Sequence, residues 1–488
     1  MLARRTRFLP MLVAVASASG CGDPSPSPSP SPPVVLEWPQ WRGPTGMGIS
    51  AAPELPETWS EKSSNIRWRT AIPGSGNSSP IVSGGRVYLT SAVPTAGDDS
   101  QADRVGLALD FETGEILWQT PVMTAPAENR HRLNTSAGPT PATDGELVVV
   151  YFGAVLAALD LEGRIVWKTE IDPDYFEYSR YAAGSSPVLT ADSVIIAQDQ
   201  ESVKNDDVGW LAAFDKKTGR QIWRRDWDDT CCSYSTPLIV EHEAGQRLLF
   251  AHSGSVEEYD LSSGETLWEH FFPINQMVSS IVADKDVLCV AGGAHNVKGA
   301  TCVRLSGTGK DTEVEVLWET TQGAPETASP VLYDGKLFMV TSQGIVTCID
   351  AVSGERLWRR RLAGGSYHVS LVAGDGKVYV PNAGGVTTVI ALEPEIRVLA
   401  ENALDRGSTA SPAIAGGALL MRTRTHLVRI GKEEVARGGG SPRTAAARPR
   451  DGPRRLRDVF DGSLVAYLVG RVGAGLSQKG YPAAGQGS

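Results

Sequence analysis

The chain has 488 residues, with 46 Lys and Arg against 56 Asp and Glu, and a formal net charge of −10 at pH 7. This acidic balance offers no overall attraction to phosphate backbones, so we do not expect nucleic acid as a partner. The length fits two or three ordinary domains or one large all-β domain, and internal repeats decide between them.

The N-terminus has the layout of an export signal. Three arginines within the first seven residues precede an apolar run that ends in small residues and is too short to span a bilayer. The next four residues, ASGC, resemble the lipobox of bacterial lipoproteins, in which the cysteine carries the lipid. Residues 1–21 are therefore predicted to be a signal peptide with lipid attachment at Cys21. The alternative is an ordinary signal peptide beside an unrelated cysteine.

Residues 22–36 form a linker rich in Pro and Ser, with the run PSPSPSPSPP at 24–33. Such a run cannot build a core and favours an extended polyproline spacer of about 3 Å per residue. An anchor followed by a spacer predicts a globular body held off a membrane.

One unit recurs between residues 37 and 432. The segment ALDFETGEILW ends at Trp118, and four close copies follow, with a looser copy ending at Trp318 and one at 389–400 that lacks the Trp. A second signature, such as SSPIV, PTPAT or ASPVL, occurs eight times. Each copy of this second signature is taken as the start of a unit. It is followed by a turn signal and, in most units, by a β-branched run, which is typical of a hairpin.

Each unit therefore predicts four short strands, and eight units predict an all-β, eight-bladed β-propeller of four-stranded antiparallel blades. The first start is preceded by a strand around Trp68 that has no Asp strand before it, whereas the last unit lacks a Trp strand. We expect the Trp68 strand to complete the eighth blade and close the ring, which removes exposed sheet edges.

These repeats resemble the PQQ-like, or quinoprotein-type, β-propeller family, whose blades carry an Ala-x-Asp-x-x-Thr-Gly-x-x-x-Trp signature. The stretches WPQWRGPTGMGIS and HRLNTSAGPTPATDG are most similar to exported PQQ-binding-like propeller lipoproteins, and the layout is more distantly similar to BamB-like outer-membrane assembly lipoproteins. The resemblance covers residues from about 38 to 432.

Asp110 and Gly114 in the first copy are the residues of a tight turn, since Asp accepts backbone hydrogen bonds and Gly takes positive φ. The resemblance implies that the Trp side chains dock neighbouring blades. The expected docking residues are Trp68, Trp118, Trp167, Trp223, Trp268, Trp318 and Trp358.

Quinoprotein dehydrogenases share the fold that this resemblance implies, and they hold PQQ with Ca²⁺ in the central funnel beside a disulfide between adjacent cysteines. The candidate cofactor residues here are Cys231, Cys232 and Asn134, and the candidate metal ligands are Asn205, Asp206 and Asp207. No haem motif, paired His metal spacing or nucleophile elbow is visible. We therefore expect no cofactor and no catalysis, with PQQ and Ca²⁺ as the alternative.

Five cysteines remain after Cys21, namely Cys231, Cys232, Cys289, Cys302 and Cys348, so at least one is free or pairs outside the chain. The predicted export makes oxidation plausible, and a bond between Cys231 and Cys232 would be strained because neighbouring Cα atoms lie about 3.8 Å apart.

The loop DPDYFEYSRY, 172–181, combines aromatic residues with Arg, the composition of interface hot spots. The alternative is that its aromatic side chains pack onto neighbouring blades. A second loop, HRLNTSAGPT, would join it in one patch near the pore. The candidate binding residues are His131, Arg132, Tyr175, Phe176, Tyr178, Arg180 and Tyr181.

Residues 433–488 are rich in Arg, Gly and Pro without periodicity, which predicts a disordered tail. The sequence thus predicts an exported, lipid-anchored, monomeric propeller of the cell envelope that binds other envelope proteins without catalysis. The alternatives are a PQQ-dependent dehydrogenase that oxidises an alcohol or sugar, and a carbohydrate or small-ligand binding module.

Overall fold

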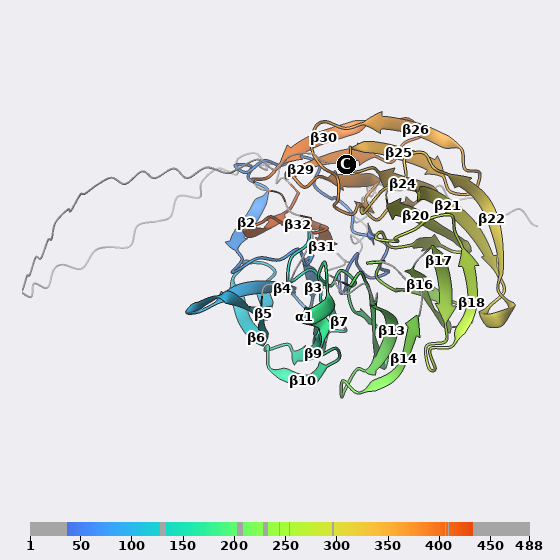
Figure 1. Ribbon diagram of the computed structural model, residues 1–488. Coiled ribbons are helices and arrows are strands. Elements are labelled where there is room, and N and C mark those ends of the chain that lie inside the picture. Colours follow the sequence, from blue (N-terminus) through green and yellow to red (C-terminus); the bar gives the residue numbers. More distant parts are fainter. Residues whose placement is uncertain are drawn as a thin grey trace, which may run out of the picture. The chain divides into compact units, whose positions relative to one another are not determined.

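The computed structural model consists of eight β-sheets arranged as the blades of a propeller (Figure 1). It describes residues 37–432, apart from 127–132, 203–207, 228–232, 244, 253, 295–296, 406 and 408. All of these residues belong to the compact unit that ends at Val435. The predicted signal peptide, linker and tail lie outside the described residues. The described part holds no helix of the length and apolarity that a membrane span requires.

The strands follow the chain blade by blade, from the innermost strand outwards. Blades 1 and 2 are β3 (Ile81–Ser83), β4 (Arg86–Thr95), β5 (Asp98–Asp110), β6 (Ile116–Pro126), then β7 (Ala142–Thr143), β8 (Leu147–Tyr151), β9 (Val155–Asp160) and β10 (Ile165–Glu170). Blades 3 and 4 are β11 (Val188–Leu189), β12 (Ser193–Gln200), β13 (Val208–Asp215), β14 (Gln221–Trp227), then β15 (Leu238–His242), β16 (Gly245–His252), β17 (Ser255–Tyr259) and β18 (Thr266–Phe271).

The second half continues in the same order. Blades 5 and 6 are β19 (Val282–Asp284), β20 (Val287–Ala294), β21 (Val297–Ser306), β22 (Glu313–Thr320), then β23 (Val331–Tyr333), β24 (Lys336–Val340), β25 (Ile345–Asp350) and β26 (Arg356–Arg361). Blades 7 and 8 are β27 (Val372–Gly374), β28 (Lys377–Pro381), β29 (Val386–Ala391), β30 (Val398–Ala403), then β31 (Ala413–Ala415), β32 (Ala418–Arg422), β33 (His426–Ile430) and β2 (Ile66–Ala71). Two short helical segments lie between strands, α1 (Tyr175–Tyr178) and the 3₁₀ turn η1 (Gly309–Asp311).

The ring closes through its N-terminal strand, as the sequence predicts. β2 pairs antiparallel with β33, and Trp68 lies opposite Arg429. Figure 1 shows β2, in blue, in the last blade, at the outer edge of the sheet that also holds β31 and β32. The eight-bladed fold and this closure are therefore confirmed.

Burial follows the position of a strand within its blade. The inner strands β3, β27 and β31 are buried at every residue, whereas the outer strand β10 is exposed at four of its six residues. An inner strand is covered on both faces by neighbouring blades, so it reads as a continuous apolar run, while an outer strand faces solvent. The hydrophobic core therefore lies in the seams between blades.

The N-terminal segment, residues 37–59, crosses the ring and was not predicted from any repeat. Trp38 pairs with Val82 of the inner strand β3, and the Thr143 N–H of blade 2 donates to Pro39 O at 2.8 Å. Further on, β1 (Ile49–Ser50) adds to blade 7 as a fifth strand, parallel to β27. The segment thus runs across the channel from blades 1 and 2 to blade 7.

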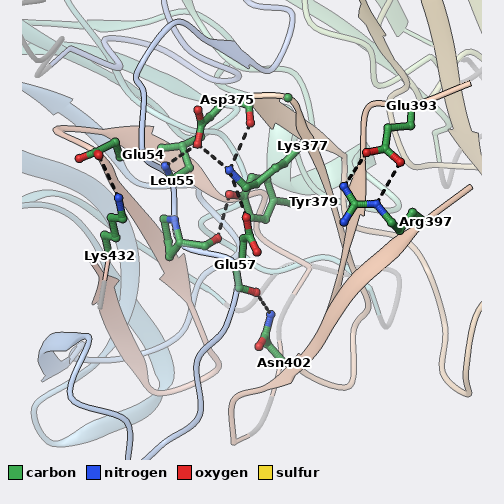
Figure 2. A network of polar contacts seen from close by, with 12 residues as sticks. Glu54, Leu55, Glu57, Asp375, Lys377, Tyr379, Glu393, Arg397, Asn402 and Lys432 are labelled. Atoms are coloured by element: carbon green, nitrogen blue, oxygen red, sulfur yellow. Dashed lines mark hydrogen bonds and ion pairs between the residues drawn. The ribbon is translucent and has the colours of Figure 1, made fainter. Parts of the chain in front are cut away.

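Polar contacts fasten the end of this segment to blade 7 (Figure 2). The Leu55 N–H donates to Asp375 Oδ2 at 3.0 Å, and Lys377 Nζ lies 2.5 Å from the same oxygen. The Tyr379 hydroxyl donates to Pro56 O at 2.9 Å, and the Asn402 side chain donates to Glu57 O at 2.8 Å. Segment and ring are therefore joined by hydrogen bonds as well as by apolar packing.

Candidate functional site

A ring of hydroxyl groups surrounds the channel where each inner strand begins. In seven of the eight ring residues, all except Ser370, the backbone N–H donates to the hydroxyl oxygen of the ring residue in the next blade, at 2.9–3.1 Å. The ring residues are Ser79, Thr140, Ser186, Thr236, Ser280, Ser329, Ser370 and Ser411, all buried. At about 1 kcal/mol each, these bonds join successive blades at the axis.

The ring residues belong to the second repeat signature. In six of the eight, the Ser or Thr directly precedes a proline, as in SSPIV and PTPAT. Proline has no N–H, so the preceding residue supplies the donor at this level of the strand. The sequence therefore carried a signal for the ring, although the signature alone identifies only a strand start.

A cavity of about 490 Å³ lies above the ring and receives side chains from all eight blades. Trp41 of the N-terminal segment forms its base. The lining residues beyond the ring include Asn77, Asn134, Tyr181, Glu201, Tyr234, Gln276, Thr327, His368 and Thr409. The volume is within the range of about 300–1,000 Å³ that small-ligand sites occupy.

Two loops meet at the rim of the cavity, the one that holds Asn134 and the aromatic loop. We call residues 171–182, between blades 2 and 3, the rim loop. The Asn134 side chain donates to Tyr181 O at 3.0 Å. Gly138 has no side chain, and a Cβ there would lie 2.7 Å from Asn134 Oδ1 and 2.8 Å from Ala183 O. The two loops are therefore packed against each other.

A buried polar network fixes the rim loop. The Tyr178 hydroxyl donates to Asp172 Oδ2, and Gln198 Nε2 donates to the same oxygen at 2.9 Å. The Tyr151 hydroxyl donates to Gln198 Oε1. Burial, followed by the hydrogen bond to Asp172, raises the pKa of Tyr178, so its phenol stays protonated and acts as a donor.

The candidate binding residues of the rim loop differ in accessibility. Tyr175 is fully buried and Tyr178 nearly so, which matches the alternative that aromatic side chains pack onto the blades. Phe176 is partly buried and packs edge-on against Tyr175, with 5.0 Å between the two ring centroids. Arg180 is ion-paired with Glu201 and keeps about a third of its side chain exposed, and Tyr181 is half-buried. Composition alone does not separate the inward-facing aromatic residues from the outward-facing ones.

Several predicted site residues cannot be placed. His131, Arg132, Asn205, Asp206, Asp207, Cys231 and Cys232, together with Cys21, lie outside the described residues. Within the described ranges, no group of three or more His, Cys, Asp or Glu side chains is arranged to hold a metal ion.

The other cysteines form a pair and a buried thiol. Cys289 on β20 faces Cys302 on β21, and the two form a disulfide with a Cα–Cα distance of 4.1 Å. The Cys348 thiol is free and buried, and burial raises its pKa to about 12. A thiol with such a pKa is a poor nucleophile at neutral pH.

The tryptophans of the repeat lie at the seams between blades. The indole N–H donates to the carbonyl of the residue after the turn Asp in the next blade for Trp68, Trp118, Trp167, Trp223 and Trp318, at 2.8–2.9 Å. Trp268 donates instead to Glu258 of its own blade. The Trp358 Nε1 has no hydrogen-bond partner among the described residues.

The turn glycine of each copy explains the shape of this contact. Gly163 has φ +83, and a Cβ there would lie 2.6 Å from Trp118 Cδ2. Thr120 Oγ1 adds a hydrogen bond to Gly163 O at 2.6 Å. Gly is thus required for the turn and also for the close approach of the indole.

The described lining of the cavity fits PQQ poorly. This cofactor carries three carboxylates, yet the lining residues include the carboxylate of Glu201 and no Lys or Arg among those described. Arg180 of the rim loop is paired with Glu201.

An eight-bladed ring with a Trp–turn contact in successive blades defines the chain as a PQQ-like repeat propeller. A family model described as outer membrane protein assembly factor BamB matches residues 58–208, 124–313 and 310–462. The chain belongs to this family, and the predicted resemblance is confirmed.

Relatives and solved structures agree with this assignment. The outer membrane protein assembly factor BamB of Yersinia pestis is 22% identical over 66% of this chain and 68% of its own. The crystal structure of BamB from Moraxella catarrhalis has a TM-score of 0.50 and 12% identity, over 74% of this chain and all of that one. A europium-containing methanol dehydrogenase has a TM-score of 0.57 and 12% identity, over 81% and 89% of the two chains. At this identity the solved structures show the fold alone.

Proposed function

We propose that this BamB-like propeller is a non-catalytic scaffold of the cell envelope that binds other envelope proteins through its rim loop. Its body would be a monomeric propeller, anchored through lipid on Cys21 and spaced from the membrane by residues 22–36. The alternative is a PQQ-dependent dehydrogenase, since the fold is also that of a methanol dehydrogenase.

The observation that carries the proposal is the fixed conformation of the rim loop. Within the loop, the Asp172 carboxylate accepts hydrogen bonds from Tyr178 and from Gln198 of blade 3. At the end of the loop, the Asn134 side chain donates to Tyr181 O. A loop that is ordered before binding loses little conformational entropy when a partner docks. Phe176, Arg180 and Tyr181 remain partly accessible on it, and aromatic residues with Arg are favoured in interface hot spots.

The Cys289–Cys302 disulfide supports an exported location. Both sulfurs are fully buried between blades, and structural disulfides persist mainly in oxidising compartments. Intact mass of the protein purified from membranes tests the anchor. The expected mass begins at a lipidated Cys21, and a mass that retains residues 1–20 or lacks lipid would refute it.

Charge reversal on the rim loop tests the scaffold. Asp174 and Glu177 are exposed there, so Asp174→Arg with Glu177→Arg changes the surface with little effect on the core. The matched control is Asp192→Arg with Asp284→Arg, at exposed hairpin turns on the opposite end of their blades. Affinity capture from membranes should return the same envelope proteins with wild type and control, and lose them with the rim-loop variant.

Two results would overturn the proposal that the protein is a scaffold. The first is an unchanged set of captured proteins in the rim-loop variant. The second is PQQ-dependent oxidation of an alcohol or sugar, measured with a dye acceptor after incubation with PQQ and Ca²⁺, because this would establish the enzyme instead.

A further inference from the structure

The cavity has polar groups that the protein itself leaves available. The Tyr234 hydroxyl oxygen is buried with no well-aligned hydrogen-bond partner among the described residues; the Glu201 backbone N–H lies near enough to lower its pKa, but the hydroxyl hydrogen has no acceptor there. The Gln276 side chain lines the same cavity, and no side-chain hydrogen bond joins it to the described residues. Buried polar groups are rarely left unpaired, so such a group in a cavity points to a ligand.

The hydroxyl ring has the same property. Seven of its oxygens accept a backbone N–H from the preceding blade, as in Thr236 N–H to Ser280 Oγ. The hydroxyl hydrogens are not donated to any described atom of the protein. Six of these seven hydroxyls, all except that of Ser280, line the cavity, and each is a satisfied acceptor with a spare donor.

Charge argues against an anionic ligand. Glu201 lines the cavity, and Asp199 lies buried beside it, where its carboxylate accepts the Ser233 N–H at 3.1 Å. Burial, and then the charges of Asp199 and Glu201, raise the pKa of Tyr234. No Lys or Arg belongs to the described lining. Glu201 is paired with Arg180, so the described lining holds no unpaired cation to receive a carboxylate or phosphate.

Trp41 supplies an aromatic surface at the base. Its indole is half-buried and lines the cavity, and the guanidinium of Arg42 lies 5.7 Å from the ring centroid. An aromatic base with surrounding hydroxyl, amide and carboxylate groups suits a ligand that has apolar C–H faces and hydroxyls around its edge. Each hydroxyl of such a ligand can donate one hydrogen bond and accept others. It can therefore accept from the spare hydroxyl hydrogens of the ring and donate to the carboxylate of Glu201.

We propose that the cavity is a binding site for a neutral saccharide of one or two rings, seated on Trp41 and hydrogen-bonded by Tyr234, Gln276 and the hydroxyl ring. The site is independent of the rim-loop scaffold. A protein that binds saccharide but captures no envelope protein, and the converse, are distinct outcomes.

The test is titration calorimetry of the full chain with maltose, cellobiose and N,N′-diacetylchitobiose, with citrate as an anionic comparison. We expect at least one disaccharide to bind with a Kd of about 1 mM or tighter, and citrate not to bind. Tyr234→Phe removes only the hydroxyl, and Gln276→Ala removes the amide. Each should weaken the affinity about three- to tenfold, the effect of one lost hydrogen bond.

Gln119→Ala, at an exposed position on the outer strand β6, is the matched control and should leave the affinity unchanged. Thermal unfolding confirms that each variant is folded. The proposal is overturned if no disaccharide binds at about 10 mM, ten times that Kd. It is also overturned if citrate binds in place of the sugars, or if Tyr234→Phe and Gln276→Ala bind as wild type does.

Discussion

At two seams between neighbouring blades, the tryptophan indole has hydrogen-bond partners of different chemistry. Between blades 1 and 2, the Trp118 indole donates to the Leu161 carbonyl at 2.8 Å and lies against Gly163. Between blades 4 and 5, the Trp268 indole donates to the carboxylate of Glu258, and Arg247 lies 2.5 Å from that carboxylate. The first seam uses neutral backbone groups, and the second uses a buried ion pair.

The difference follows from the turn of blade 5. That blade has the sequence RLSGTGKD where its neighbours have Asp-x-x-x-Gly, so no turn of the usual shape receives the indole. Arg247 reaches across the seam to Thr312 at 3.3 Å, and Lys310 pairs with Glu265 at 2.6 Å. Loss of the turn is thus offset by charged contacts, which are more sensitive to single substitutions because a buried charge needs its partner.

The largest effect is expected from breaking the ion pair of the irregular seam. Glu258→Gln keeps the volume and an acceptor for Trp268 but leaves Arg247 buried without its carboxylate. We expect the free energy of unfolding to fall by about 3–5 kcal/mol, measured by urea denaturation. The double variant Arg247→Met with Glu258→Gln removes both charges and should recover most of the loss. Equal destabilisation in the single and double variants would contradict this account.

The regular seam is tested by filling its glycine. Gly163→Ala adds a Cβ that meets Trp118 in a backbone conformation with φ +83, and we expect a loss of about 1–3 kcal/mol in the same measurement. Gly145→Ala is the control, because its φ of +89 is similar but the nearest atom to a Cβ lies 3.9 Å away. The difference between the two variants measures the indole contact, and a difference of zero would show that the glycine serves the turn alone.

The indole hydrogen bond itself is isolated by comparing two tryptophans. Trp118→Phe loses the bond to Leu161 O, whereas Trp358 has no partner for its Nε1 among the described residues. We expect Trp118→Phe to be more destabilising than Trp358→Phe by about 1 kcal/mol. Midpoints of thermal unfolding give the comparison, and the reverse order would assign the stability of the seam to apolar burial.

The sequence predicts the ring well because its signals are periodic. Eight strand starts and seven tryptophans recur at regular intervals, and the missing strand of the last unit matches the extra strand around Trp68. The N-terminal segment has no such repeat. Its contacts join residues far apart in the chain, such as Arg42 and Pro330, which are 288 positions apart. The sequence around each of these residues does not indicate which distant residue it contacts.

The candidate site is predictable only in part for the same reason. The rim loop is visible as a cluster of aromatic residues, but the inward direction of Tyr175 and Tyr178 depends on the network around Gln198. Tyr234 and Gln276 come singly from different blades and meet only at the channel. The Cys289–Cys302 disulfide needs the register of β20 and β21, which a count of cysteines does not supply.

The smallest effect concerns the acid sensitivity of the regular turns. The hydrogen bond from the Thr113 N–H holds the pKa of Asp110 below its ordinary value. A lowered pKa in the folded state contributes stability above the ordinary value, and this contribution is lost as the pH falls through the folded pKa. Asp110→Asn keeps the acceptor but removes the charge, so it should cost little near neutral pH because the side chain is partly exposed. The stability difference between wild type and Asp110→Asn should therefore shrink between about pH 6 and about pH 2. A difference that grows in acid would mean that the charge of Asp110 destabilises the turn.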